Sequence, residues 1–449
     1  MANTYLKRTN GTPTNAQKGT FSAWVKRAKV GAYHRILMNY LDGNNYSYFR
    51  IHSGDYIQFY GVSGGSAVSH FKTNRLFRDT NGWFHIMLVV DTTQSTASDR
   101  IKIYVNGVQE TSFLQADYPN QNINHPMFIA SGSNYHTVGS AENGTDCWDG
   151  VMSHVHYCDG TALAPTVFGS TDSVTGEWSI TTSPSFTLGN NGYTILKDGN
   201  TITDQSSNSN DFTLGAGTLT KTEDNPSNVF ATLNALDFGA GSSAVYSYGN
   251  NRVLFSGSAI RNARSTLGMT SGKYYFEIKL TGQEGSINRW RVGITNRGSR
   301  DSTNFNLGTG TYEYGWNVDN GDIIHNNSTS VSGYGTCTTN DICSVALDLD
   351  NNKLYFAKNG TWQNSANPSS GTNGISITDV NSVNDDGAYF FAVGKNDGTY
   401  NYTLDCNFGN GYFGTTAVSS AGTNASGIGI FEYNVPNGFT ALSTKGLNE

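Results

Sequence analysis

The stretch 86-IMLVVDTTQSTASDRIKIYVNG-107 holds two short apolar runs joined by a polar turn and closed by Asn-Gly. A second stretch, 344-SVALDLDNNKLYFAKNG-360, repeats this design in the other half of the chain. The pairs Asn106-Gly107 and Asn359-Gly360 favour type I′ turns, because both central residues of that turn need positive φ. Two hairpins of one design predict two domains of the same general architecture.

Similar runs of β-branched and aromatic residues recur along most of the chain, each followed by Gly, Asn, Asp or Ser. A spacing of about ten residues between such runs is typical of all-β sandwiches and barrels. FSAWVKRA and WFHIMLVVD lie in the first third, and KYYFEIKL, WRVGITN and ICSVALDLD follow Gly272. Each run alternates enough to bury one face of a strand, and helical periodicity is almost absent. The sequence therefore predicts an all-β protein.

A polar segment rich in Thr, Ser, Asn and Gly separates the two sets of runs. We predict a first domain over 1–165, an extended connecting segment over 166–228, a second domain over 229–412, and a C-terminal tail over 413–449 that could add a last strand. The connecting segment has few large apolar residues that could hold it against a domain. They are Trp178, Phe186, Tyr193, Ile195 and Phe212.

Composition excludes several classes of protein. Charged residues are 14% of the 449, where about 25% is usual, and the net charge is −7 with no basic block, so nucleic-acid binding is not expected. The longest apolar runs, such as Ile86–Val90 and Tyr389–Val393, are too short for membrane insertion. The N-terminus has no apolar run of the signal-peptide kind. Five cysteines in a chain of this length indicate reduced thiols, and we expect Cys337 and Cys343 to be free.

Two families are recognisable in particular motifs. Residues 18–165, with KGTFSAWVKRA, GWFHIMLVVD, RIKIYVNGVQE and WDGVMSHVHYCDGTAL, resemble a laminin-G-type domain of the concanavalin A-like lectin/glucanase superfamily. Residues 229–410, with SGKYYFEIKL, RVGITN, YGWNVDNGDIIHNN, DICSVALDLDNNKLYFAKNG, YFFAVGK and LDCNFGN, resemble a SPRY domain. Both resemblances imply antiparallel jelly-roll β-sandwiches, in agreement with the strand pattern.

The pairing of these domains, with NVFATLNALD between them and VPNGFTAL at the end, resembles virion proteins of tailed phages, particularly marine ones. This resemblance implies a non-enzymatic structural and recognition protein located in the virion and made in the host cytoplasm. The expected place is the tail or a fibre, with a role in attachment to a host-surface glycan or protein; capsid decoration as a head fibre or knob is the alternative. The expected partners are other virion proteins, and assembly into a homo-oligomer stays open. A glycan-degrading enzyme and an intracellular SPRY adaptor are the competing interpretations.

A glycan-degrading enzyme of the retaining type would need two carboxylates about 5 Å apart. The glucanase pattern Glu-x-Asp-x-x-Glu does not occur in the sequence. The nearest acidic alternation is Asp348 and Asp350, which lead into Asn351–Asn352, and Asp and Asn are standard turn residues. We therefore predict no catalytic residues.

Two groups of residues could hold a metal ion. His154, His156 and Cys158 share one face of a predicted strand and are zinc-ligand types, but no fourth ligand is evident, and polar residues facing solvent or an interface are the preferred interpretation. Acidic loops at Asp42 and at Asp385-Asp386 offer oxygen ligands for calcium, although turn formation explains them as well. We predict no metal and no cofactor.

The best candidate for ligand binding is the hairpin 46-YSYFRIHSGDYIQFYG-61. Phe49, Ile51, Ile57 and Phe59 alternate on its apolar face. The other face carries tyrosine, arginine and histidine, which combine rigid contact area with hydrogen-bonding groups. The alternative is that the second sheet or a loop covers this face. The candidate ligand-binding residues on it are Tyr48, Arg50, His52, Tyr56 and Tyr60.

Further candidates come from the second domain, because the SPRY resemblance implies binding through loops at one end of the sandwich. Trp290, His325, Trp362 and Tyr400 lie in or near predicted loops and strand ends. Trp316 is instead expected in the core, since it alternates with Tyr314 and Val318 on one strand face.

Overall fold

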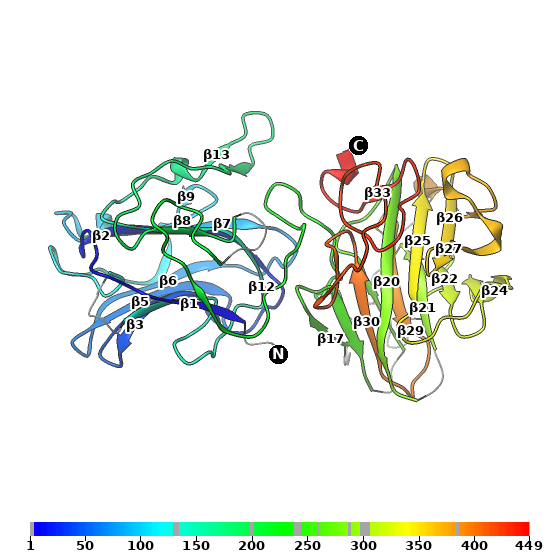
Figure 1. The fold of residues 1–449 in the computed structure, drawn as a ribbon, viewed down its shortest axis with the longest axis horizontal. Helices are drawn as coiled ribbons and strands as arrows, with labels where there is room; N and C mark the ends of the chain where they lie inside the picture. The colour runs from blue at the N-terminus through cyan, green and yellow to red at the C-terminus, as the bar shows by residue number, and fades with distance from the viewer. Residues whose placement is uncertain are drawn as a thin grey trace. The chain divides into compact units, whose positions relative to one another are not determined.

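A computed structural model describes residues 4–128, 134–197, 202–237, 244–257, 260–285, 289–296, 306–382 and 386–448. The chain divides into two compact units, Met1–Lys221 and Thr222–Glu449 (Figure 1). Every regular element in the described ranges is a β-strand or a single-turn 3₁₀-helix, which confirms the predicted all-β class. None of the helices in those ranges is long and apolar enough to cross a membrane.

Two antiparallel sheets form the first unit, and Figure 1 shows them as two layers, with β2 and β7 in one and β3 and β5 in the other. The larger sheet has the order β10 (Phe113–Asp117), β6 (Ser66–Leu76), β5 (Tyr56–Ser63), β4 (Asn45–Ile51), β3 (His34–Asp42), β11 (Tyr135–Val138), β1 (Tyr5–Thr9), β16 (Thr213–Ala216). The smaller sheet has the order β15 (Tyr193–Ile195), β12 (Gly150–Asp159), β2 (Lys18–Arg27), β7 (Phe84–Asp91), β8 (Ile101–Val105), β9 (Val108–Gln109).

The core of this unit lies between the two sheets. Phe49 and Phe59 from the larger sheet and Phe21, Ile86 and Ile103 from the smaller sheet are buried there. Residues two apart on a strand share a face, so the alternation read in the sequence places these side chains inward.

The segment 166–228, predicted to connect two domains, contributes the short strands β13 to β16 in its described residues. β15 and β16 are edge strands of the two sheets of the first unit, and Tyr193, Ile195 and Phe212 are buried in its core. β13 (Gly169–Thr171) and β14 (Trp178–Ile180) pair with each other. Phe168 and Phe186 pack beside this pair against the outward residues Met87 and Val89 of β7. This part of the segment therefore covers the outer face of the six-stranded sheet.

In its described residues the second unit also has two main sheets, and β31 (Tyr412–Phe413) pairs with β32 (Thr416–Ala417) as a separate two-stranded sheet. The larger has the order β17 (Ala244–Ser247), β18 (Arg252–Phe255), β30 (Tyr402–Asn407), β20 (Lys273–Gln283), β25 (Ile342–Asp348), β26 (Lys353–Lys358), β27 (Thr361–Trp362), with β28 (Ile375–Ser376) beside β26 and β33 (Thr440–Ala441) beside β20. The smaller has the order β19 (Arg261–Arg264), β29 (Phe390–Lys395), β21 (Trp290–Thr295), β22 (Tyr314–Asn317), β23 (Asp322–His325), β24 (Ser328–Val331).

The core between these sheets contains Phe276, Trp316, Phe356 and Phe391, and Trp316 is fully buried as predicted. Cys337 and Cys343 are buried in the same core, and their Sγ atoms lie 2.9 Å apart without a disulfide bond.

The two Asn-Gly turns have the geometry that the sequence predicts. Asn106 and Gly107, between β8 and β9, have φ of 48° and 76°, and Asn359 and Gly360, between β26 and β27, have φ of 47° and 79°. Positive φ at both positions is the signature of the type I′ turn. In each unit this turn follows the hairpin, β7–β8 or β25–β26, that the repeated motif predicted.

The C-terminal segment, residues 413–448, packs on the outer face of the nine-stranded sheet. Its strand β33 pairs in parallel with the first residues of β20, and Figure 1 shows this red segment beside β20. Phe431 and Phe439 are buried against Tyr275 and Tyr355, which point outward from β20 and β26. A large aromatic surface on this sheet is thereby removed from water.

A buried carboxylate anchors the same segment. Glu277, on β20, is fully buried, and its Oε1 accepts hydrogen bonds from the backbone N–H of Tyr433 at 2.9 Å and from the Tyr275 hydroxyl at 3.0 Å. Its Oε2 accepts from the backbone N–H of Glu432 at 2.9 Å. Burial raises the pKa of Glu277 to about 7, even though these hydrogen bonds favour its charged form.

Candidate functional site: a tyrosine-rich sheet face

The hairpin β4–β5 has the two faces that its sequence predicts. Phe49, Ile51, Ile57 and Phe59 point into the core and are at most 1% exposed. The five candidate residues on the other face, Tyr48, Arg50, His52, Tyr56 and Tyr60, are all partly exposed. In the described chain the second sheet therefore lies on the apolar face, not on this one.

Strand register places tyrosines next to each other on the outward face. Tyr48 of β4 lies opposite Tyr60 of β5, and Tyr60 lies opposite His70 of β6. Their ring centroids are 5.5 Å and 4.8 Å apart, and Tyr46 stacks beside Tyr48 at 6.3 Å. These distances are typical of favourable aromatic pairs, so the rings form one continuous surface across three strands.

Two arginines hold this surface in place. The guanidinium groups of Arg35 and Arg50 lie 4.0 Å and 4.7 Å from the ring centroid of Tyr48. Both form ion pairs with Oδ2 of Asp146, at 3.2 Å and 3.3 Å. Arg50 Nε also donates to Gln58 Oε1 at 2.9 Å. Because two guanidinium groups share one carboxylate, the centre of the face keeps an excess of positive charge.

The tip of the hairpin adds a second aromatic group. His52 stacks on Tyr56 with centroids 4.4 Å apart, and Tyr33 meets His52 edge-on at 4.7 Å. His52 Nδ1 accepts a hydrogen bond from the backbone N–H of Gly54 at 3.0 Å, so Nε2 carries the proton of the neutral ring. Burial, and then the charge of Arg50, lower the pKa of His52 and keep it neutral at physiological pH.

Part of this face was not predicted from the sequence. Tyr40 and Tyr135 are adjacent on β3 and β11, with ring centroids 5.7 Å apart, and Lys7 Nζ lies 3.7 Å from the centroid of Tyr135. The alternation in 34-HRILMNYLD-42 could have identified Tyr40, but Arg35 reaches the same face only through a bulge between Arg35 and Leu37. Nothing local identifies Asp146, which lies far away in sequence. We call the whole surface the tyrosine face: Arg35, Tyr40, Tyr46, Tyr48, Arg50, Tyr60 and Tyr135, with His52 and Tyr56 at its tip.

The candidates in the second unit do not form one site. Trp290 is fully buried, which corrects its assignment to a binding rim: with Val292 and Ile294 it fills the inward face of β21. His325 stacks on Tyr314 at 4.2 Å, and Trp362 lies 6.4 Å from Tyr275 under the C-terminal segment.

Tyr400 is partly buried in the loop before β30, where its backbone N–H donates to Asp397 Oδ1 at 2.9 Å. Among the described residues, no ring contact joins any two of these four candidates.

The histidine and cysteine positions on β12 are buried, which corrects the expectation that they face solvent or an interface. His156 stacks on Phe168 at 5.3 Å and shares a hydrogen bond with Thr194, and the Cys158 thiol donates to the Thr187 carbonyl at 3.2 Å. A bulge after Ser153, with His154 at φ 49°, also interrupts the alternation that placed the three side chains on one face.

The acidic positions are turn residues. Asp348 accepts hydrogen bonds from the backbone and side chain of Asn351, at 3.0 Å and 2.9 Å, as the turn interpretation predicts. Asp42 Oδ1 accepts from the backbone N–H of Asn44 at 2.8 Å. Asp386 forms an ion pair with Arg264, and Asp385 lies outside the described residues.

Comparison with known families identifies both domains. Residues 1–168 match the profile described as the concanavalin A-like lectin/glucanases superfamily, and residues 273–410 match the SPRY domain. The chain therefore combines a concanavalin A-like domain with a SPRY domain, as its motifs predicted. Domains of these kinds are typically non-catalytic binding domains. No curated protein matches the chain.

Several solved structures are similar to parts of the chain. The SPRY domain of human HERC1 is 15% identical and matches over 36% of this chain and 91% of its own, with a TM-score of 0.30. A human SPRY domain is 13% identical, over 36% and 93%, with a TM-score of 0.27. The native heptameric SAP-like pentraxin of Limulus polyphemus is 14% identical, over 36% and 71%, with a TM-score of 0.26.

Proposed function

We propose that this protein is a non-enzymatic virion protein of a tailed phage that contributes to attachment to a glycan or protein on the host surface through the tyrosine face. The observation that carries the proposal is the continuity of that face, on which tyrosine rings from adjacent strands surround two arginines. The motif pairing that resembles phage virion proteins supports the biological setting. Tail or fibre is the preferred position.

The face has the physical properties of a recognition surface. Tyrosine offers a broad apolar ring and a hydroxyl while losing little conformational entropy on binding, and arginine adds planar hydrogen-bond donors. The shared ion pair with Asp146 and the stacking on Tyr48 hold both arginines before a ligand arrives. Such preorganisation lowers the entropic cost of binding. The excess positive charge suits a ligand with neutral hydroxyls and an occasional carboxylate, as surface glycans have.

We propose a non-enzymatic role because the one acidic alternation in the sequence serves as a turn. Asp348 is bonded to Asn351 and paired with Lys273, so it is not placed across a cleft from a second carboxylate. Saturable release of reducing sugar from a host polysaccharide, abolished by a single Asp or Glu substitution, would contradict this part of the proposal.

Two experiments test the remainder. Peptide mass spectrometry of purified particles, separated into heads and tails, should find the chain in the tail fraction. Recovery only with heads would support capsid decoration, and absence from particles would contradict the virion assignment. Fluorescently labelled protein should bind intact host cells, and Tyr48→Ala should weaken that binding. Chemical cross-linking of the same particles would identify the virion partners and any homo-oligomer.

A further inference from the structure

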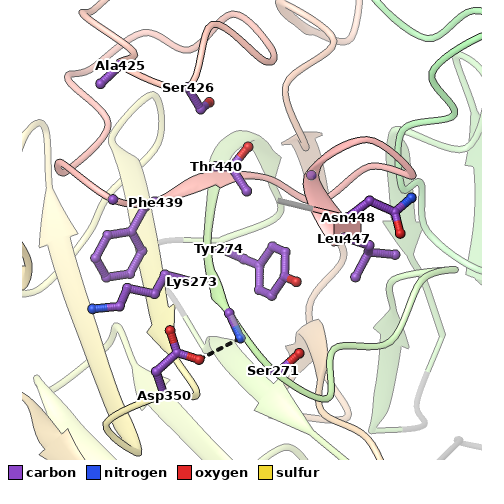
Figure 2. Close-up of a pocket in the computed structure, with 13 residues that line it drawn as sticks. Ser271, Lys273, Tyr274, Asp350, Ala425, Ser426, Phe439, Thr440, Leu447 and Asn448 are labelled. Carbon is purple, nitrogen blue, oxygen red and sulfur yellow. Dashed lines mark hydrogen bonds between the residues drawn. The ribbon is translucent and has the colours of Figure 1, made fainter.

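The two ends of β25 in the second unit differ in chemistry. Beyond its last residue lies a cavity of about 630 Å³, which Figure 2 shows with Tyr274 and Phe439 in its lining. These rings are 3% and 1% exposed, and Asp350 Oδ1 accepts a hydrogen bond from the backbone N–H of Gly272 at 2.9 Å, as the dashed line marks. The cavity walls are thus bonded within the protein. The first residues of β25 instead bring two thiols together.

These thiols belong to Cys337 and Cys343, which meet in the core between the two sheets. Both side chains are fully buried, and their Sγ atoms lie 2.9 Å apart. A disulfide bond joins its sulfurs at about 2.05 Å, so these two need to approach each other by only about 1 Å. The sulfurs therefore lie almost at bonding distance.

Different sheets hold the two cysteines. Cys343 lies in β25 of the larger sheet, opposite Ile278 of β20. Cys337 lies in the segment 332–341, which crosses from β24 of the smaller sheet to β25. Its backbone N–H donates to the carbonyl of Val318, directly after β22 of the smaller sheet, at 3.0 Å. A bond between the sulfurs would therefore join the two sheets of the sandwich.

A tight turn brings Cys337 back toward β25. The backbone N–H and the hydroxyl of Thr338 donate to Asp341 Oδ2 at 2.8 Å and 3.1 Å. Lys358 Nζ donates to the carbonyl of Thr336 at 2.7 Å and pairs with Asp341 at 3.0 Å. None of these interactions uses a sulfur atom, so they position the two thiols before any bond forms.

Cys406 shows that proximity within this core is selective. It is also fully buried, in β30, and it lies opposite Ile278 on the other side of β20 from Cys343. Two strand spacings, about 10 Å, separate the Cα atoms of Cys406 and Cys343. A disulfide needs Cα atoms within about 7 Å, so Cys406 is out of reach of Cys343.

The crossover segment gives an oxidant a route to the pair. Residues 332–338 form no strand or helix, and Thr336, Thr338, Thr339 and Asn340 are exposed. Segments of this kind open locally more readily than core strands do. Opening exposes Cys337 first, because it lies on the segment, whereas Cys343 lies within the sheet.

We propose that Cys337 and Cys343 are a site of disulfide formation, which locks the segment 332–341 to β25 when the protein meets an oxidising medium. The oxidant is a small-molecule disulfide such as oxidised glutathione. The Cys337 thiolate attacks it and releases one thiol, and the Cys343 thiolate then attacks the Cys337 sulfur and releases the second.

The exchange balances, because the oxidant gains the two electrons that the cysteine pair loses, and the two released thiols take up the two thiol protons. The site lies in the second unit and needs no ligand, so the inference goes beyond the proposed function.

The test is a thiol count of the full chain after equilibration with oxidised glutathione. One sample is kept in buffer and another in urea below the unfolding transition, which favours local opening. Alkylation in denaturant followed by mass spectrometry should label all five cysteines of the reduced chain and two fewer after oxidation. Proteolytic cleavage before Asp341 should leave the two flanking peptides joined until a reductant is added.

Two variants form a matched pair, because each removes one buried thiol from the same core. Oxidation should form no internal disulfide in Cys343→Ala and should still join Cys337 to Cys343 in Cys406→Ala. In the unmodified chain the bond closes a loop between residues six positions apart, which should shift the unfolding equilibrium of the second unit roughly fortyfold toward the folded state.

Three results on the unmodified chain would overturn the inference. They are retention of both thiols in both samples, a product that stops at a glutathione adduct, and a bond that joins other cysteines. In the first case the pair would be two thiols that only pack against each other.

Discussion

Two sheet faces in this protein have similar sequence patterns, but one is partly exposed and the other is covered. On β4, Tyr48 and Arg50 point away from the core and remain partly exposed. On β20, Tyr275 and Glu277 also point away from the core, yet both are buried under the C-terminal segment. An aromatic and charged outward face is thus compatible with recognition or with internal packing. The outcome depends on whether a distant segment covers it.

The six-stranded sheet of the first unit gives a third case. Its outward residues Met87 and Val89 lie under Phe168 and Phe186. His85 and His156 at this surface are neutral and packed against the ring of Phe168. In the second unit, by contrast, the Glu277 carboxylate holds the covering segment. The two covered faces should therefore respond to acid in opposite directions.

The largest expected effect is acid destabilisation of the first unit. Burial lowers the pKa of five histidines there to about 3: His34, His85, His125, His136 and His156. Below the unfolded pKa of about 6.5 the unfolded chain binds these protons and the folded chain does not, so the free energy of unfolding falls as the pH falls. At pH 5 the loss is about 2 kcal/mol for each histidine.

Urea unfolding at pH 7.5 and pH 5, followed by hydrogen-exchange mass spectrometry, assigns each transition to one unit. The transition of β2 and β7 should move to much lower urea at pH 5. A first unit with equal stability at both pH values would show that these histidines are not buried in neutral form.

The second effect concerns the covered face of the second unit. Phe431→Ala removes a ring that is 1% exposed and lies 4.9 Å from Tyr275. Loss of such a side chain costs about 3–5 kcal/mol, whereas Tyr48→Ala, at a partly exposed site, should cost about 1 kcal/mol. Equal effects of the two substitutions on their units in urea unfolding would remove the distinction between the covered and the open face.

The third effect is the pH dependence of Glu277. Its pKa is about 7 in the folded protein against 4.5 unfolded, so between these values the folded state binds the proton more tightly. Stability of the second unit from this group is therefore greatest at acidic pH and falls by roughly 3 kcal/mol as the pH rises through 7. Glu277→Gln should remove this slope, and Glu432→Gln, which leaves the buried carboxyl intact, should keep it. An unchanged slope in Glu277→Gln would exclude Glu277 as its source.

Local signals in the sequence were sufficient for much of the fold. Alternation in β4 and β5 assigned both faces correctly, and Asn-Gly pairs located two type I′ turns. The prediction for Trp290 was wrong because this residue stands at the first position of its strand. A short apolar pattern does not distinguish a strand end from a core position there. The prediction for His156 was wrong because the segment that follows β12 folds back over it, and the polar residues of that segment hid the aromatic contacts with Phe168 and Phe186.

The candidate site was predicted in its centre and missed at its margins. Tyr48 and Tyr60 share one hairpin, so local pairing brings them together. Asp146, which fixes both arginines, comes from a loop about a hundred residues away from Arg50, as the 96-residue separation shows. No pattern within either segment encodes that contact.

The central claim, that the open face is the recognition surface, is tested most directly by the affinity of Tyr48→Ala for intact host cells, with Phe431→Ala as the partner variant from the covered face. We expect Tyr48→Ala to cost about 2 kcal/mol of binding, roughly thirtyfold in affinity, while its circular dichroism spectrum stays unchanged. Phe431→Ala should lower stability and leave the affinity of the first unit intact. Unchanged affinity in folded Tyr48→Ala would contradict the claim.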